Sequence, residues 1–284
     1  MKKILLSLLA VFATQAEAQN LEKSLLWKIS GNGIKEASYL YGTIHITCNA
    51  TLPQKAINAL EATNQLYLEL DMDDPSLQQS MMQGMMMKDG KTMASLVSAE
   101  DFKIVDAFLV KQLGFSAQML NTFKPFMISA MLYPKMIDCE MQSIEQKLMD
   151  VTKEQKEEVF GLESVAEQMK VFDAIPYDIQ MKELVKTAKT DLEKDKKEME
   201  LFMEIYKSED INAMYKATQE SENEITSKFE EILLSNRNKN WIPIIEKVAK
   251  EKATFFGVGA GHLGGEMGVI QLLQKKGYKV EAIF

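Results

Sequence analysis

The apolar residues near both ends of the chain fall into short runs typical of β-strands. These runs are rich in β-branched and aromatic residues and are bounded by Gly, Pro and Asn. The predicted strands are residues 25–30, 38–46, 65–70, 157–162, 254–258 and 279–284. The turn signal Gly31-Asn32-Gly33 joins the first two strands, and a helix of roughly ten residues is expected from Pro53 onward.

The C-terminal segment follows the order strand, Gly-rich loop, helix, strand. The helix is expected over 267–276, because Gly277 is a residue type that commonly ends helices. This order predicts a βαβ unit in which strands 254–258 and 279–284 form a parallel pair with a right-handed crossover.

The middle of the chain, about residues 74–250, is mostly helical in pattern and highly charged. Lys and Glu alternate at helical spacings over Lys182–Glu204, which predicts one long solvated helix. The fold class is therefore predicted to be α/β: a mixed sheet with strands from both chain ends and large helical insertions. A single domain is expected to span residues 19–284.

The first 18 residues have the features of a signal peptide. Lys2 and Lys3 precede the apolar run 4–13, and Ala16-Glu17-Ala18 matches a cleavage site. The apolar run is too short for a permanent membrane anchor. We therefore expect an exported protein, periplasmic or secreted, with no stable membrane anchor.

The composition argues against one class of binding partner, nucleic acid. A formal net charge of -8 gives no electrostatic reason to bind nucleic acid. The two cysteines, Cys48 and Cys139, are permitted to pair in an oxidising compartment. Their spacing alone leaves open whether they do.

The chain contains only two histidines, and both follow a predicted strand in the pattern G-x-x-H. His45 follows Gly42-Thr43-Ile44, and His262 follows Gly259-Ala260-Gly261. Ligands of open parallel sheets bind at the carboxyl ends of strands, and imidazole is a common metal ligand and general base. We expect the two histidines to share one site; the alternative is two unrelated turn residues.

Acidic residues also follow predicted strands. Glu69 and Asp71 end the strand 65–70, and Glu163 follows the strand 157–162. With the histidines they make an N/O ligand set that suits divalent Mn, Co or Zn. Capping of the next turn is the favoured interpretation of Asp71, whereas for Glu69 and Glu163 structural and functional roles both stay open.

Arg237 is the single arginine among 33 Lys and Arg residues. Its retention indicates a need for a planar bidentate donor or for a charge that survives burial. A substrate carboxylate, a developing oxyanion or a clamp on Glu163 would meet that need, and chance is the alternative.

Several methionines lie between residues 72 and 93, including Met81, Met82 and Met85. Thioethers bind Cu(I) in oxidising compartments. Methionine is also an adaptable packing residue, so a flexible apolar helix or groove wall is the favoured interpretation.

Five segments of the chain resemble the TraB/GumN family, which includes the Tiki proteins. They are SYLYGTIHI (38–46), LYLELD (66–71), GLESVAEQ (161–168), SNRNKNW (235–241) and GVGAGHLGGEMGVIQLLQKKGYKV (257–280). The resemblance implies an α/β core like that of the EreA and ChaN proteins, paired G-x-x-H motifs, an essential Glu and an Arg. Tiki proteins are metalloproteases active with Mn or Co. The motif positions carried over are His45, His262, Glu163 and Arg237, with Glu69 in the position of the strand-end acid.

The leading hypothesis is an exported, divalent-metal-dependent hydrolase that cleaves peptide or amide bonds of a peptide or protein substrate. The metal (Mn, Co or Zn) is held by His45, His262 and Glu69. Glu163 or Glu69 acts as general base, and Arg237 orients the substrate or stabilises the oxyanion. The alternatives are a peptide-binding module without turnover and a metal-free hydrolase with a histidine as base.

Overall fold

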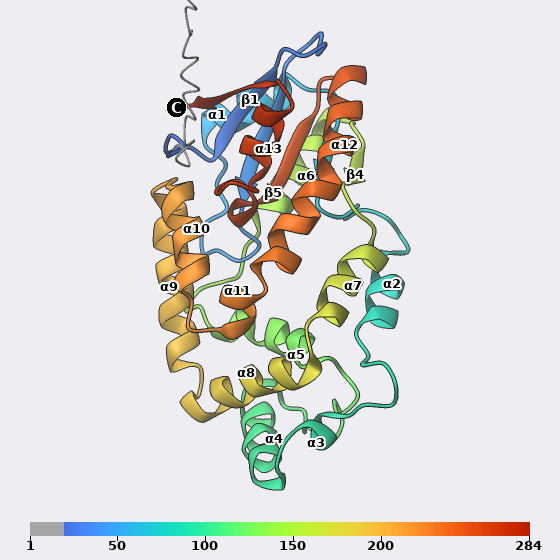
Figure 1. The fold of residues 1–284 in the computed structure, drawn as a ribbon, viewed down its shortest axis with the longest axis vertical. Coiled ribbons are helices and arrows are strands. Elements are labelled where there is room, and N and C mark those ends of the chain that lie inside the picture. Colours follow the sequence, from blue (N-terminus) through green and yellow to red (C-terminus); the bar gives the residue numbers. More distant parts are fainter. Residues whose placement is uncertain (1–19) are drawn as a thin grey trace, which may run out of the picture.

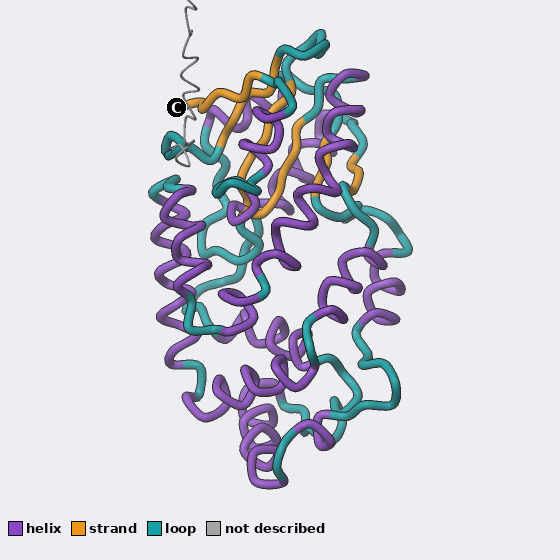
Figure 2. Tube along the Cα trace, viewed as in Figure 1, coloured by secondary structure: helices purple, strands orange, loops and turns teal. Residues whose placement is uncertain are grey.

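The computed structural model describes residues 20–284. The signal peptide expected at residues 1–18 lies outside the described residues. The sheet occupies one end of the elongated molecule and helices fill the other (Figures 1 and 2). Within residues 20–284, no helix has both the length and the apolar character that crossing a membrane requires.

A six-stranded mixed sheet forms the core of the first end, in the order β4-β3-β5-β2-β1-β6. The strands are β1 (Leu26–Ser30), β2 (Ser38–Thr43), β3 (Leu66–Leu68), β4 (Val159–Gly161), β5 (Phe255–Gly259) and β6 (Lys279–Ile283). Strands β4, β3, β5 and β2 are mutually parallel, whereas β1 runs antiparallel to β2 and β6. The predicted α/β fold, with strands from both chain ends in one mixed sheet, is confirmed.

Thirteen α-helices surround and extend this sheet in the described part of the chain. They are α1 (Gln54–Glu61), α2 (Leu77–Gly84), α3 (Met93–Leu96), α4 (Ala99–Leu113), α5 (Pro125–Leu132), α6 (Ile144–Gln155), α7 (Val165–Ala174), α8 (Tyr177–Thr190), α9 (Glu193–Lys207), α10 (Ile211–Glu220), α11 (Glu224–Lys228), α12 (Asn236–Glu251) and α13 (Val269–Lys275). In Figure 1, α12 and α13 lie in front of the sheet and α1 and α6 behind it.

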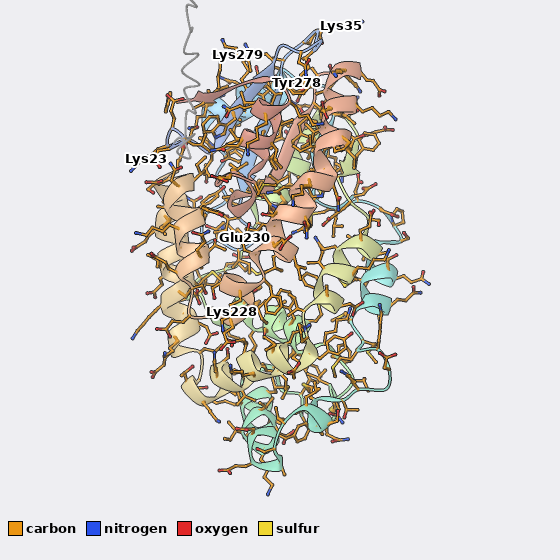
Figure 3. The ribbon with its side chains drawn as sticks, in the orientation of Figure 1. Lys23, Lys35, Lys228, Glu230, Tyr278 and Lys279 are labelled. Carbon is orange, nitrogen blue, oxygen red and sulfur yellow. A yellow bond between two sulfur atoms is a disulfide. The ribbon has the colours of Figure 1, made fainter. Side chains whose placement is uncertain are left out.

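The β1–β2 hairpin forms where the turn signal predicts it. Gly31, Asn32 and Gly33 all have positive φ angles, of 77°, 45° and 88°, which glycine and asparagine tolerate best. Lys35 marks this end of the hairpin in Figure 3. The two strands pair from Leu26 with Tyr41 to Ile29 with Ser38. β2 ends at Thr43, three residues before the predicted end of this strand at Ile46.

The predicted parallel pairing of the last two strands is wrong. β6 pairs antiparallel with β1, from Leu26 with Ile283 to Ser30 with Lys279. Both edges of β5 are occupied by parallel neighbours, β2 on one side and β3 on the other. The strands from the N-terminal part of the chain therefore separate β5 from β6, and β6 completes the free edge of the hairpin.

The single long helix predicted over Lys182–Glu204 is also wrong. Asp191 and Leu192 have φ angles of 49° and 71°, and they divide the segment into α8 and α9. The Asp191 carboxylate accepts hydrogen bonds from Lys111 and Gln112 of α4, and Leu192 is buried in the helical core. These tertiary contacts stabilise a left-handed break that the helical periodicity does not reveal.

The helical end has a hydrophobic core of its own, distinct from the core around the sheet. Its centre contains Met93, Leu109, Ile128, Met181 and Leu184, all fully buried. Helix α8, which was expected to be solvated, therefore contributes one buried face to this core.

Candidate functional site

Four of the predicted site residues follow four neighbouring parallel strands. Leu68 of β3 is level with Gly161 of β4, and Thr43 of β2 is level with Gly259 of β5. The residues just beyond these positions are His45, Glu69, Glu163 and His262. Because the carboxyl ends of parallel strands meet at one edge of the sheet, all four side chains originate there.

Arg237, in the first turn of α12, connects three of these residues. Its Nη2 donates to Glu69 Oε2 at 2.5 Å and to Glu163 Oε1 at 2.6 Å, and its Nε donates to Glu163 Oε1 at 3.1 Å. Its Nη1 lies 3.1 Å from His262 Nε2. The side chains of Arg237, Glu69 and Glu163 are only 11%, 11% and 7% exposed, so this is a buried ion cluster. Only the guanidinium fork makes all these contacts at once, which accounts for arginine here.

Two further residues of α12 complete the cluster, and sequence reasoning did not single them out. The Asn238 side chain places Oδ1 2.6 Å from His262 Nδ1 and donates from Nδ2 to the backbone oxygen of Met267. Trp241 is fully buried, lies under the Arg237 guanidinium at 4.8 Å, and donates from Nε1 to Glu163 Oε2. The sequence feature that could have identified them is their position in the family-like segment SNRNKNW, which also contains Arg237.

A π-helical turn, Glu231–Ser235, precedes α12 and sets the position of Arg237. Lys228 and Glu230 mark its approach in Figure 3, and Leu233 within it accepts a hydrogen bond from Arg237 Nη1 at 3.1 Å. Such turns occur frequently at functional sites, where they shift the side chains that follow.

The electrostatics of the cluster keep His262 neutral and Glu69 ionised. Burial lowers the pKa of His262 to about 3, against the opposing charge of Glu69. Burial by itself would raise the pKa of Glu69, but the charges of Arg237 and His45 and the hydrogen bond from the Gly259 N–H hold that pKa well below its usual range. Because Asn238 Oδ1 can only accept, Nδ1 of the neutral His262 carries the proton and Nε2 offers a lone pair to the cluster.

His45 forms a second pair next to the cluster. Its Nδ1 lies 2.6 Å from Oε1 of Glu145, a residue in the first turn of α6 that sequence reasoning missed. The His45 side chain is 64% exposed, whereas that of Glu145 is 4% exposed. Desolvation lowers the pKa of His45, but the hydrogen bond and charge of Glu145 outweigh it and raise the pKa to about 9. No direct contact joins His45 to His262 in the described residues, although the charges of Glu69 and Arg237 also act on the pKa of His45.

A disulfide bond holds this second pair together. Cys48 and Cys139, whose pairing the sequence left open, are bonded with their Cα atoms 5.6 Å apart. The same two segments are joined by a β-bridge between Thr47 and Gln142. The loop that carries His45 is thereby attached to the segment that leads into α6 and Glu145.

Asp71 does not join the cluster. It is half-buried, and desolvation together with Asp73 and Asp74 raises its pKa to about 6. In a continuous strand, Glu69 and Asp71 would point to the same face of the sheet. β3 ends at Leu68, however, so strand geometry does not place Asp71 beside Glu69.

Two donors of the cluster are of the types that divalent ions accept. The His262 Nε2 lone pair and Glu69 Oε1 are 3.7 Å apart and form an N/O pair of the kind that Mn, Co and Zn accept. Among residues 20–284, however, no three His, Cys, Asp or Glu side chains are arranged to hold an ion. Arg237 Nη1 occupies the His262 lone pair, and His45 makes no contact with this pair, so the arrangement described here offers an ion no complete ligand set.

A cavity of about 850 Å³ adjoins Glu163. Its walls come from the segment after β3, from α2, from the end of β4 and from α7. The methionines between residues 72 and 93 do not line it, so the groove wall expected from them is not formed at this cavity. Met87 and Met93 are instead buried in the helical core, whereas Met82 is 64% exposed.

Comparison with known proteins agrees with the motif pattern. Neither a search of curated proteins nor a search of solved structures found a match to this chain. The family model described as TraB/PrgY/gumN matches residues 25–282, which is nearly the whole chain. The resemblance seen in the sequence motifs is thereby confirmed, and the chain belongs to the TraB/PrgY/gumN family.

Proposed function

We propose that this chain is an exported, divalent-metal-dependent hydrolase that cleaves peptide or amide bonds. The observation that carries the proposal is the buried cluster at the strand ends, in which Nε2 of the neutral His262 imidazole lies 3.7 Å from the ionised Glu69 carboxylate and Arg237 bridges the two. The imidazole nitrogen and the carboxylate lie side by side, although both now contact the Arg237 guanidinium. A neighbouring imidazole nitrogen and carboxylate are a common pair of metal ligands.

The partners of both histidines support this assignment. Histidine ligands of metals usually donate their second ring N–H to a carboxylate or carbonyl, which orients the ring. Asn238 occupies that position for His262, and Glu145 occupies it for His45. Nε2 is therefore the coordinating atom of each ring, once Arg237 leaves His262 and once His45, which Glu145 holds protonated, gives up its Nε2 proton; Glu69 is the third ligand.

A bound divalent ion supplies two things to hydrolysis: a water of lowered pKa and a polarised substrate carbonyl. Arg237 stabilises negative charge on the carbonyl oxygen with Nη1, the donor that now contacts His262. Glu163 accepts hydrogen bonds from Arg237 and from Trp241, and so aims the guanidinium.

The general base is Glu163 or Glu69. In the structure described here, Arg237 lowers the pKa of Glu69 and so keeps that carboxylate a weak base. A substrate that draws Arg237 away raises the basicity of the carboxylate that loses the contact.

A second candidate, a metal-free hydrolase, is favoured by one observation. His45 and Glu145 form an oriented imidazole–carboxylate pair at the protein surface, as in hydrolases that use histidine for proton transfer. In this case Arg237 remains in contact with His262, and His45 exchanges the proton.

One experiment separates the candidates. The gently purified protein is analysed for bound metals, treated with a chelator and assayed on fluorogenic peptides after addition of Mn, Co or Zn. We expect metal and turnover to be lost together in the double variant His45→Ala/His262→Ala. The control is Lys216→Ala, an exposed lysine on α10.

Each outcome selects one interpretation. Turnover that survives the chelator but requires histidine selects the metal-free mechanism. Peptide that is held without cleavage under every condition selects a binding module without turnover. Equal metal content in the wild type and the double variant overturns the proposed site.

A further inference from the structure

The edge strand β4 leads directly from the rim of the sheet into the candidate site. It pairs only with β3 in the sheet, and Glu163 follows its last residue, Gly161, by two positions. In Figure 1, β4 and the helices α7 and α2 lie together on the right-hand side of the molecule. An edge strand has one row of backbone N–H and C=O groups without a strand partner.

The register shows which backbone groups form this free row. Leu66 N–H donates to Glu158 O at 3.1 Å, and Leu162 N–H donates to Leu68 O at 2.8 Å. Residues 158, 160 and 162 therefore face β3, because parallel pairing uses alternate residues. The N–H and C=O groups of Val159 and Gly161 point away from the sheet.

The cavity of about 850 Å³ adjoins the Gly161 end of this edge and reaches Glu163, whereas Val159 is buried and does not line it. Phe160 and Tyr67 line it and stack on one another with ring centroids 5.0 Å apart. Val165 and Met169 of α7 add apolar surface to the same cavity. A free strand edge with apolar walls suits an extended peptide, since main-chain hydrogen bonds provide affinity and alternate side chains enter pockets.

The charges of the cavity indicate which peptides fit best. Five carboxylates and two lysines line it: Asp71, Asp74, Glu163, Glu167, Asp173, Lys88 and Lys170. Glu163 already contacts Arg237, and Asp173 contacts Lys88 and Lys124. Within residues 20–284, neither Asp71 nor Asp74 forms an ion pair. A basic side chain of the peptide would complement them.

We propose that an extended peptide, preferably one with a basic residue, pairs with β4 as an additional strand and brings its scissile bond to Glu163. The cleavage step rests on the proposed hydrolase function, whereas the docking of the peptide does not. Binding and turnover are therefore measured separately.

The probe is a fluorescein-labelled octapeptide, selected from a random library on the immobilised double variant His45→Ala/His262→Ala. Its affinity is measured by fluorescence anisotropy with a series of analogues, each carrying one backbone N-methyl group. We expect N-methylation to weaken binding about tenfold at two positions that are two residues apart and little elsewhere, because the free row of β4 offers the carbonyl groups of Val159 and Gly161 alone to the alternate N–H groups of a docked strand.

A matched pair of protein variants locates the site. Ala166 lines the cavity from α7, whereas Ala174 is exposed on the same helix and does not line it. We expect Ala166→Trp to weaken binding at least tenfold and Ala174→Trp to leave it unchanged.

Two results overturn the docking proposal: failure to select any peptide, and N-methyl effects without a period of two. Equal binding by the two tryptophan variants overturns the location. Period-two binding without any cleavage leaves the docking proposal standing and rejects the hydrolase function.

Discussion

The guanidinium of Arg237 is the point at which the buried cluster is most vulnerable. Replacing it by the apolar side chain in Arg237→Met leaves Glu69 and Glu163 buried without their cation. Removing one partner of a buried ion pair typically costs about 3–5 kcal/mol, because the remaining charge stays desolvated.

The variant limits this cost by binding a proton, so the expected loss depends on pH. Protonating a glutamate costs about 1.4 kcal/mol for each pH unit above its ordinary pKa of about 4.3. That is about 4 kcal/mol at pH 7.5 and about 1 kcal/mol at pH 5.0. We therefore expect Arg237→Met to lose about 3–5 kcal/mol of unfolding free energy at pH 7.5 and about 1–2 kcal/mol at pH 5.0.

The sign of the pH dependence differs between the wild type and the variant. In the wild type the folded-state pKa of Glu69 lies below its unfolded value. Its stabilising contribution is fully present above about pH 4.3 and is lost only as the pH falls further. In folded Arg237→Met, burial without the cation should raise the pKa of the Glu69 carboxyl group above its value in the unfolded chain. The unfolding free energy of the variant therefore decreases as the pH rises from 5.0 to 7.5.

Urea unfolding monitored by tryptophan fluorescence at the two pH values measures both quantities. The control is Lys216→Met, which removes the cation of the exposed pair between Lys216 and Glu220 and should change stability by at most about 1 kcal/mol. A loss below 1 kcal/mol for Arg237→Met at pH 7.5, or a loss equal at both pH values, would refute the ion-cluster reasoning.

Three further changes test other parts of the fold. Replacing both cysteines of the Cys48–Cys139 bond with serine removes a cross-link between positions 91 residues apart and should lower the unfolding free energy by about 4–5 kcal/mol. Unchanged stability in urea would show that the two segments stay together without the bond. In Gly84→Ala the new Cβ lies 2.2 Å from Met169 Cγ, so α2 and α7 must separate at a cost of about 1–3 kcal/mol, seen as a lower melting temperature. An unchanged melting temperature would contradict that packing. Lys124→Met removes a cation that is 1% exposed and 2.7 Å from Asp173, and it should destabilise more than Lys88→Met, whose lysine side chain is 64% exposed; equal urea midpoints would contradict this order.

Local patterns were sufficient for most of the sheet end. The runs around β1, β2 and β5, the hairpin turn at Gly31–Gly33 and the G-x-x-H positions follow from side-chain character and turn preference. The strand-end positions of Glu69 and Glu163 were equally readable, since parallel strands end at a common edge. For Arg237, the sequence left a substrate carboxylate, an oxyanion, a clamp on Glu163 or chance as explanations. The structure shows the contact with Glu163.

Other features depend on contacts that leave no local trace. Glu145 lies in the charged helical middle like many other glutamates, and only the approach of the His45 loop distinguishes it. The β6–β1 pairing depends on which edges other strands have already occupied. The break between α8 and α9 depends on α4, which binds Asp191 from a distant part of the chain.

By itself, the sequence determined the family, the α/β class and the residues that end the parallel strands, because these follow from motifs, periodicity and turn chemistry. Only the tertiary structure decided that Arg237 joins Glu69, Glu163 and His262, that Glu145 holds His45, and that Cys48 and Cys139 are bonded. The physical reason is that burial and charge pairing act between segments far apart in the chain. Their strength depends on distances of a few ångströms that no local pattern encodes.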